Sequence, residues 1–142
     1  MRVFVDSNVF FDYVLKRAPF FVDANALMLI LNERVITAGT NPNNFPHVFY
    51  LLRKQYGTVA AKHKLALLRA ILECEPLTAE VIDMGLSKSG SVDLEDGITA
   101  ILAQRYAADV LVTRDPKGFP DQPIRVLSPK QFVDEHYAKF PY

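Results

Sequence analysis

The chain has 142 residues, of which half are hydrophobic and 23% are charged. This length and composition suit one folded domain over residues 1–142 with a real hydrophobic core, and they exclude a disordered chain. Sixteen basic residues balance sixteen acidic residues, so net charge predicts neither strong attraction to nucleic acid nor strong repulsion from it. Contact with RNA or DNA would need a local basic patch.

The sequence lacks the features that direct a protein into a membrane or an oxidising compartment. Cys74 is the single cysteine and cannot form an internal disulfide, which is compatible with a reducing cytoplasm. The first residues do not resemble a signal peptide, and no long uninterrupted apolar stretch occurs. We therefore expect a soluble, cytoplasmic protein that makes no membrane contact.

Short apolar runs alternate with segments of helical periodicity along the chain. Strands are predicted at residues 2–5, 35–38, 74–77, 109–113 and 124–127. Helices are predicted at residues 9–16, 20–34, 44–55, 58–72, 79–87, 93–102 and from 129 onwards, with a frayed tail after 136. Loops are predicted at residues 39–44, 89–91 and 114–122. This alternation predicts an α/β domain with a mostly parallel central sheet and helices on both faces.

The first predicted strand is followed directly by Asp6, Ser7 and Asn8. Residues 2–5 form a continuous apolar run, which is typical of a strand buried on both faces. Open α/β sheets bind ligands beyond the carboxyl ends of their strands, so Asp6 is a candidate site residue. All three residues are also good helix N-caps, and this segment alone leaves both interpretations open.

Aspartates also mark the ends of later elements. Asp93 and Asp96 begin a predicted helix and, three residues apart, share one face of its first turn. Asp115 follows the strand at residues 109–113. Chain topology can bring these carboxylates to the sheet edge that holds Asp6. Capping explains Asp93 and Asp96 equally simply, and a turn explains Asp115. The aspartates expected to be solvated helix residues are Asp12, Asp23, Asp83 and Asp134.

Carboxylates gather only where their charge is compensated. The natural partner is a hard divalent cation, Mg²⁺ or Mn²⁺, which binds carboxylate oxygens and water and can activate that water for attack on a phosphate. No competing motif occurs: the sequence has no glycine-rich phosphate loop, no Cys/His zinc cluster and no Gly-x-Ser-x-Gly elbow.

Three stretches carry a family resemblance across essentially the whole chain. They are VFVDSNVFFDYVL at residues 3–15, DLEDGITAILAQRYAADVLVTRDPKGF at 93–119 and IRVLSPKQF at 124–132. In order and spacing they resemble the PIN-domain family, in particular the VapC-type toxin ribonucleases of toxin–antitoxin pairs. The resemblance implies a PIN-like three-layer fold and a Mg²⁺- or Mn²⁺-dependent endoribonuclease.

Carried over by position, the resemblance implies that Asp6, Asp96 and Asp115 are the metal-side carboxylates and that Asp93 is an accessory acid. Polar residues beside them would orient carboxylates or water. These supporting residues are Ser7, Asn8 and Thr113.

One departure from the family pattern concerns the helix after the second strand, which usually carries an early acid, most often Glu. Residues 41–55 contain neither Asp nor Glu. His47 falls nearest that position, with Asn44 one turn earlier. His47 is a candidate for a water-mediated phosphate contact or a proton transfer, and equally for a polar residue that lines a cleft.

Substrate contact requires cations, and Arg114 and Lys117 beside Asp115 are the best placed. Solvated surface positions would also explain both. The resemblance implies an RNA substrate, a cognate antitoxin and a homodimer. A surplus of aromatic residues near the first helices and at residues 45–50 fits core packing, a dimer contact or an antitoxin groove.

Two alternatives to a nuclease remain. The missing acid favours a PIN-fold RNA-binding or interaction module with weak or no nuclease activity. A metal phosphatase or phospho-receiver domain also places aspartates at parallel strand ends. That class is disfavoured because Asp6-Ser7-Asn8 lacks the Asp-x-Asp arrangement.

Overall fold

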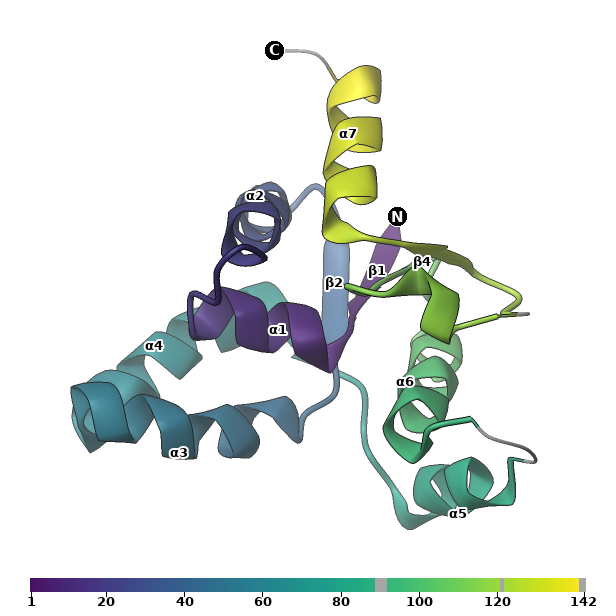
Figure 1. Ribbon diagram of the computed structural model, residues 1–142, viewed down its shortest axis with the longest axis horizontal. Helices are drawn as coiled ribbons and strands as arrows, with labels where there is room; N and C mark the ends of the chain where they lie inside the picture. The colour runs from purple at the N-terminus through teal and green to yellow at the C-terminus, as the bar shows by residue number, and fades with distance from the viewer. Residues whose placement is uncertain (89–91, 121, 141–142) are drawn as a thin grey trace.

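The computed structural model describes residues 1–88, 92–120 and 122–140, and within them five strands form one central sheet (Figure 1). The strands are β1 (Arg2–Val5), β2 (Thr37–Thr40), β3 (Leu72–Cys74), β4 (Val110–Val112) and β5 (Arg125–Leu127). Their order is β3-β2-β1-β4-β5, and every neighbouring pair is parallel. The predicted α/β architecture with a mostly parallel sheet is confirmed.

Seven α-helices within the described residues connect and cover the strands. They are α1 (Ser7–Val14), α2 (Phe21–Asn32), α3 (Asn44–Tyr56), α4 (Thr58–Ile71), α5 (Ala79–Ser87), α6 (Leu94–Arg105) and α7 (Pro129–Lys139), with a short 3-10 helix η1 (Pro116–Gly118). The predicted N-caps Thr78, Asp93 and Ser128 all accept backbone N–H hydrogen bonds. No helix among the described residues is both long and apolar enough to cross a membrane.

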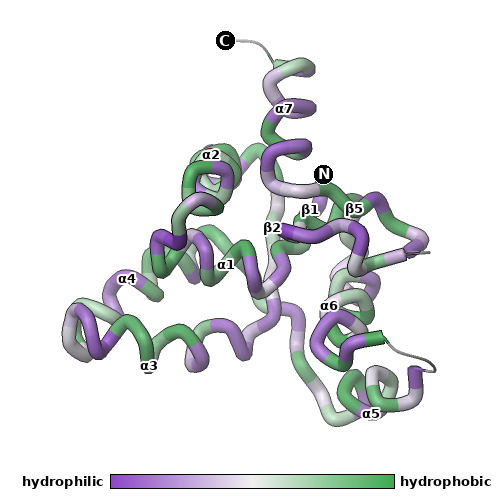
Figure 2. The backbone as a smooth tube through the Cα atoms, in the orientation of Figure 1, coloured by the Kyte–Doolittle hydropathy of each residue, from purple (hydrophilic) through white to green (hydrophobic). Residues whose placement is uncertain are grey.

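The sheet divides the hydrophobic core into two halves, because side chains alternate between its faces along each strand. Val3 and Val5 face one half, with buried residues of α1, α2, α3, α4 and α7. Phe4 and Leu111 face the other half, with buried residues of α5 and α6. Apolar and polar residues alternate along α1 and α3, as expected when one face of a helix packs on the core (Figure 2). The three-layer prediction therefore holds.

Some predicted boundaries are wrong. Residues 39–40 were predicted as a turn but belong to β2. Gly39 fits there because a Cβ atom at this position would lie 2.7 Å from the ring of Tyr106. β3 lies at residues 72–74 rather than 74–77, with Leu72 paired to Ala38. α7 continues to Lys139, and the rings of His136 and Phe140 lie 5.3 Å apart in the segment predicted to fray. The predicted loop at 89–91 lies outside the described residues.

Candidate metal centre

The carboxyl ends of three neighbouring strands meet at one edge of the sheet, where α1 begins (Figure 1). Val5 of β1 is in register with Thr40 of β2 and with Val112 of β4. Asp6 continues this register, since its backbone N–H donates to the carbonyl oxygen of Val112 at 2.9 Å. The residues that follow β1 and β4 therefore leave the sheet side by side, as the sequence predicts.

Asp6 is 4% exposed and is held by neutral donors. The backbone N–H of Ser7 and the hydroxyl of Thr99 donate to Oδ1 at 2.7 and 3.3 Å, and the hydroxyl of Thr113 donates to Oδ2 at 2.8 Å. Burial raises the pKa of Asp6, and these hydrogen bonds partly oppose that rise. Asp6 is thus the N-cap of α1 and also a fixed carboxylate at the strand end.

Asp96 and Asp115 both lie close to Gly118 in η1. A Cβ atom at Gly118 would lie 3.5 Å from Oδ2 of Asp96 and 4.0 Å from Oδ2 of Asp115. Burial, followed by the charges of neighbouring carboxylates, raises the pKa of Asp96 to about 6. These neighbours are Asp6, Asp93, Glu95 and Asp115. The structure therefore brings the three predicted metal-side acids into one electrostatic cluster.

Asp93 has a different position from the other three acids. It is exposed and caps α6, accepting from the backbone N–H groups of Glu95 at 2.9 Å and Asp96 at 3.2 Å. The predicted cap is therefore present, and its carboxylate adds negative charge beside Asp96.

A hydrogen-bond chain runs from Ser7 into the interior. The Ser7 hydroxyl donates to Oδ1 of Asn44 at 2.8 Å, Nδ2 of Asn44 donates to the Thr40 hydroxyl at 2.9 Å, and Thr40 donates to the Val5 carbonyl at 2.8 Å. Asn44 is 3% exposed. Of the two polar candidates on α3, Asn44 therefore adjoins the site.

His47 lies one turn further along α3 and is exposed. Its ring lies nearly perpendicular to the ring of Phe11, with the ring centres 5.0 Å apart. Thr40 and Thr99 belong to the site but were not predicted from the sequence. Thr99 is three residues after Asp96, so the same helical face predicts its proximity, whereas Thr40 was hidden by the wrong end assigned to β2.

The segment after β4 is tied to α1. Asn8 accepts from the backbone N–H of Arg114 at 3.2 Å and donates to the Thr113 hydroxyl at 3.4 Å. Arg114 forms an ion pair with Asp12. Asp12 is 2% exposed, so the prediction that it is a solvated helix residue is wrong. Its burial is possible because the guanidinium of Arg114 compensates its charge. Lys117 is exposed.

The donor set suits a hydrated hard cation. None of the ion pairs among the described residues involves Asp6, Asp96 or Asp115, so their charge is not compensated by protein cations. In the same residues, no three His, Cys, Asp or Glu side chains lie close enough together to hold a metal ion between them. Mg²⁺ typically binds through one or two carboxylates and keeps several waters, and the arrangement fits that mode.

The fold and the site together define an α/β protein with an acidic cluster at the carboxyl edge of a parallel sheet. Residues 2–117 match the PIN domain family model, and the chain belongs to this family. No curated protein matches the sequence.

Solved structures show the same fold at low sequence identity. VapBC2 from Rickettsia felis, bound to a DNA fragment from its promoter, is 18% identical with a TM-score of 0.59 over 90% of this chain and 98% of that chain. FitAB bound to an IR36 DNA fragment is 14% identical with a TM-score of 0.60 over 89% and 94%. FitAcB from Neisseria gonorrhoeae is 13% identical with a TM-score of 0.53 over 90% and 98%.

Proposed function

We propose that the protein is a Mg²⁺- or Mn²⁺-dependent endoribonuclease that cleaves RNA phosphodiester bonds, and that it is the cytoplasmic toxin of a type II toxin–antitoxin pair. The observation that carries this proposal is the fixed, buried Asp6 beside Asp96 and Asp115, none of which forms an ion pair with a cation of the described residues. These three acids would hold the ion, one or two of them directly and the rest through its water molecules, with Asp93 as an accessory charge. When bound, the ion would bind the scissile phosphate and lower the pKa of the attacking water.

The remaining site residues orient that cluster. The Thr113 hydroxyl donates to Asp6 and accepts from the backbone N–H of Asp115 at 3.4 Å, so one side chain links two of the acids. Ser7, through Asn44, fixes the start of α1 against β2. Neutral hydrogen bonds of this kind hold carboxylates in place without cancelling their charge.

Groups at the rim of the site would meet the substrate. Arg114 and Lys117 lie on either side of Asp115 in the chain, and each can contact a phosphate of single-stranded RNA. His47 is exposed on α3 and is available for a water-mediated phosphate contact.

Asp6→Asn tests this proposal directly. We expect the variant to lose RNA cleavage and growth toxicity while its circular dichroism spectrum stays native, because the amide preserves the shape but not the charge. Asp134→Asn is the matched control, since it removes an exposed aspartate from α7. RNA cleavage by Asp6→Asn at the rate of the wild type would overturn the proposal.

The second candidate is an RNA-binding or interaction module with weak or no nuclease activity. It is favoured by the start of α3, which carries no acid where the family pattern expects one: His47 falls nearest that position, and Asn44 lies one turn earlier. Calorimetric titration with Mn²⁺ distinguishes the two. Binding that disappears in Asp96→Asn supports the metal centre, whereas RNA binding without any Mn²⁺ binding supports the module.

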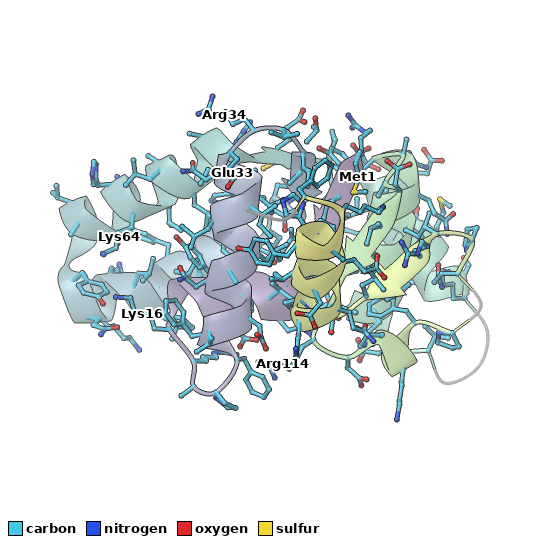
Figure 3. All side chains as sticks on the ribbon, turned by 90° about the horizontal axis from the view of Figure 1, so that it is seen from above. Met1, Lys16, Glu33, Arg34, Lys64 and Arg114 are labelled. Carbon is cyan, nitrogen blue, oxygen red and sulfur yellow. The ribbon has the colours of Figure 1, made fainter. Side chains whose placement is uncertain are left out.

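An antitoxin would bind in the groove between α1, α2 and α4, which has a volume of about 380 Å³. Apolar side chains such as Tyr13, Phe21 and Leu65 line it together with Lys16 and Lys64. Figure 3 labels these two lysines. This surface suits an apolar segment with acidic flanks. Co-expression with a short neighbouring reading frame should give a stable complex.

We also propose that the isolated chain is a homodimer, which light scattering should report. A monomer would contradict the dimer proposal.

A further inference from the structure

Asp12 has an unusual environment for an aspartate on a surface helix. It lies one turn after Asn8 on α1 and is 2% exposed. A buried carboxylate is costly unless it is paired and hydrogen-bonded. Within the described residues, its ion-pair partner is Arg114, which lies in the segment that follows β4.

Arg114 is fixed on several sides. Its Nε donates to Oδ2 of Asp12 at 3.0 Å and its Nη2 donates to Oδ1, which is a bidentate pair. The ring of Phe20, the residue directly before α2, lies against the guanidinium, with Cζ 3.8 Å from the ring centre. Figure 3 labels Arg114 near the loop between α1 and α2. The backbone N–H of Arg114 donates to Asn8. A flexible side chain is thus held in one orientation.

One edge of the guanidinium stays open to solvent. The Arg114 side chain is 34% exposed, and in the described part of the chain its Nη1 donates no hydrogen bond. The next residue is Asp115, whose carboxylate belongs to the acidic cluster. A substrate phosphate must approach that cluster against its negative charge, and a planar guanidinium is the side chain best matched to phosphate oxygens.

We propose that Asp12 and Phe20 are positioning residues that hold Arg114 as a preorganised phosphate-binding group of the RNA-cleaving site, an inference that rests on the proposed function. The negative charge of Asp12 cancels the positive charge of Arg114, which would otherwise attract RNA. Electrostatic attraction therefore does not explain the presence of Asp12. Its advantage is geometric. A donor that is already oriented does not have to be ordered when the transition state forms.

The test is steady-state cleavage of a short single-stranded RNA with Mn²⁺. We expect Arg114→Gln to lower kcat roughly 100-fold, as for loss of one oriented transition-state donor. Asp12→Asn should lower kcat about tenfold and Phe20→Leu about threefold, neither raising KM, because a misplaced donor costs rate rather than binding. Tyr56→Leu is the matched control, since it removes an exposed ring whose centre lies 4.6 Å from Nζ of Lys64 and should leave kcat unchanged.

Two further measurements separate positioning from folding and from charge. Asp12→Asn combined with Arg114→Gln should be no slower than Arg114→Gln alone, because Asp12 acts through Arg114. Fluorescence anisotropy without metal should show weaker RNA binding for Arg114→Gln only. Should Asp12→Asn fail to fold, Phe20→Leu decides, because Phe20 is exposed at the start of α2.

Wild-type kcat in both Asp12→Asn and Phe20→Leu, or additive losses in the double variant, would overturn the inference alone. In that case the wild type still cleaves RNA and Asp6→Asn does not. A wild type that binds RNA but never cleaves it would overturn the proposed function, and the inference with it.

Discussion

Replacing Asp96 by asparagine should stabilise the fold while removing cation binding. Burial and neighbouring carboxylates raise the pKa of Asp96 from 3.8 to about 6. At 1.36 kcal/mol per pKa unit, a shift of this size corresponds to roughly 3 kcal/mol. Solvent screening of this partly exposed side chain reduces the figure to about 1.5 kcal/mol. Losing a favourable charge in the first turn of α6 subtracts about 0.5 kcal/mol.

The expected net gain is therefore about 1 kcal/mol, or roughly 3 °C in Tm for a chain of this size. Its sign depends on pH. Because folding raises the pKa, the folded state binds the proton more tightly than the unfolded state. The penalty is absent below pH 3.8, grows as pH rises, and is complete above pH 6. The gain from Asp96→Asn should thus appear at neutral pH and vanish in acid.

Thermal unfolding followed by circular dichroism, at about pH 4.5 and about pH 7.5 with EDTA, measures this difference. Glu95→Gln is the matched control, because Glu95 is exposed on the same turn and should give a smaller gain. Saturating Mn²⁺ should reverse the order, since a cation at 100 times its Kd stabilises the wild type by about 2.7 kcal/mol. A loss of stability in Asp96→Asn at neutral pH, or a gain independent of pH, would refute the reasoning.

Three further substitutions probe the supports of the site and the fold. Thr113→Val removes the 2.8 Å hydrogen bond that lowers the pKa of Asp6, so the acidic limb of the pH–rate profile should move to higher pH; an unshifted limb would contradict this. Gly39→Ala places a methyl group 2.7 Å from the ring of Tyr106 and should cost about 2 kcal/mol in urea unfolding, whereas an unchanged midpoint would show that the ring moves freely. Ser128→Ala removes a capping box and should cost about 1 kcal/mol by the same assay, unless α7 adds nothing to stability.

The fold was predictable to the extent that periodicity and capping determine it. The uninterrupted apolar run before Asp6 predicts a buried strand, and Thr78, Asp93 and Ser128 predict helix starts that the structure confirms. The ends of β2 and β3 were misplaced because tertiary contacts decide them. Gly39 looks like a turn residue in sequence, yet it lies in a strand because a ring fills the space beside it.

The site was predictable where backbone topology alone brings residues together. Parallel strands predict that Asp6 and Asp115 share an edge, and the direction of α6 predicts that Asp96 points to it. Side-chain pairing across the fold was not predictable. Asp12 satisfies every pattern for a solvated helix residue, and only the position of Arg114 shows that it is buried. The role assigned to each acid in catalysis stays a prediction.

The kind of group that holds Asp6 explains why a cation belongs to this site. A cationic partner, such as the one that holds Asp12, would neutralise a buried carboxylate and leave little affinity for a metal ion. Asp6 is instead held by a backbone N–H and two hydroxyl groups, so its position is fixed while no ion pair within the described part of the chain compensates its charge. Together with the raised pKa of Asp96, this charge makes the acidic cluster destabilising when no cation is bound. Cation binding should therefore raise the free energy of unfolding as well as support catalysis.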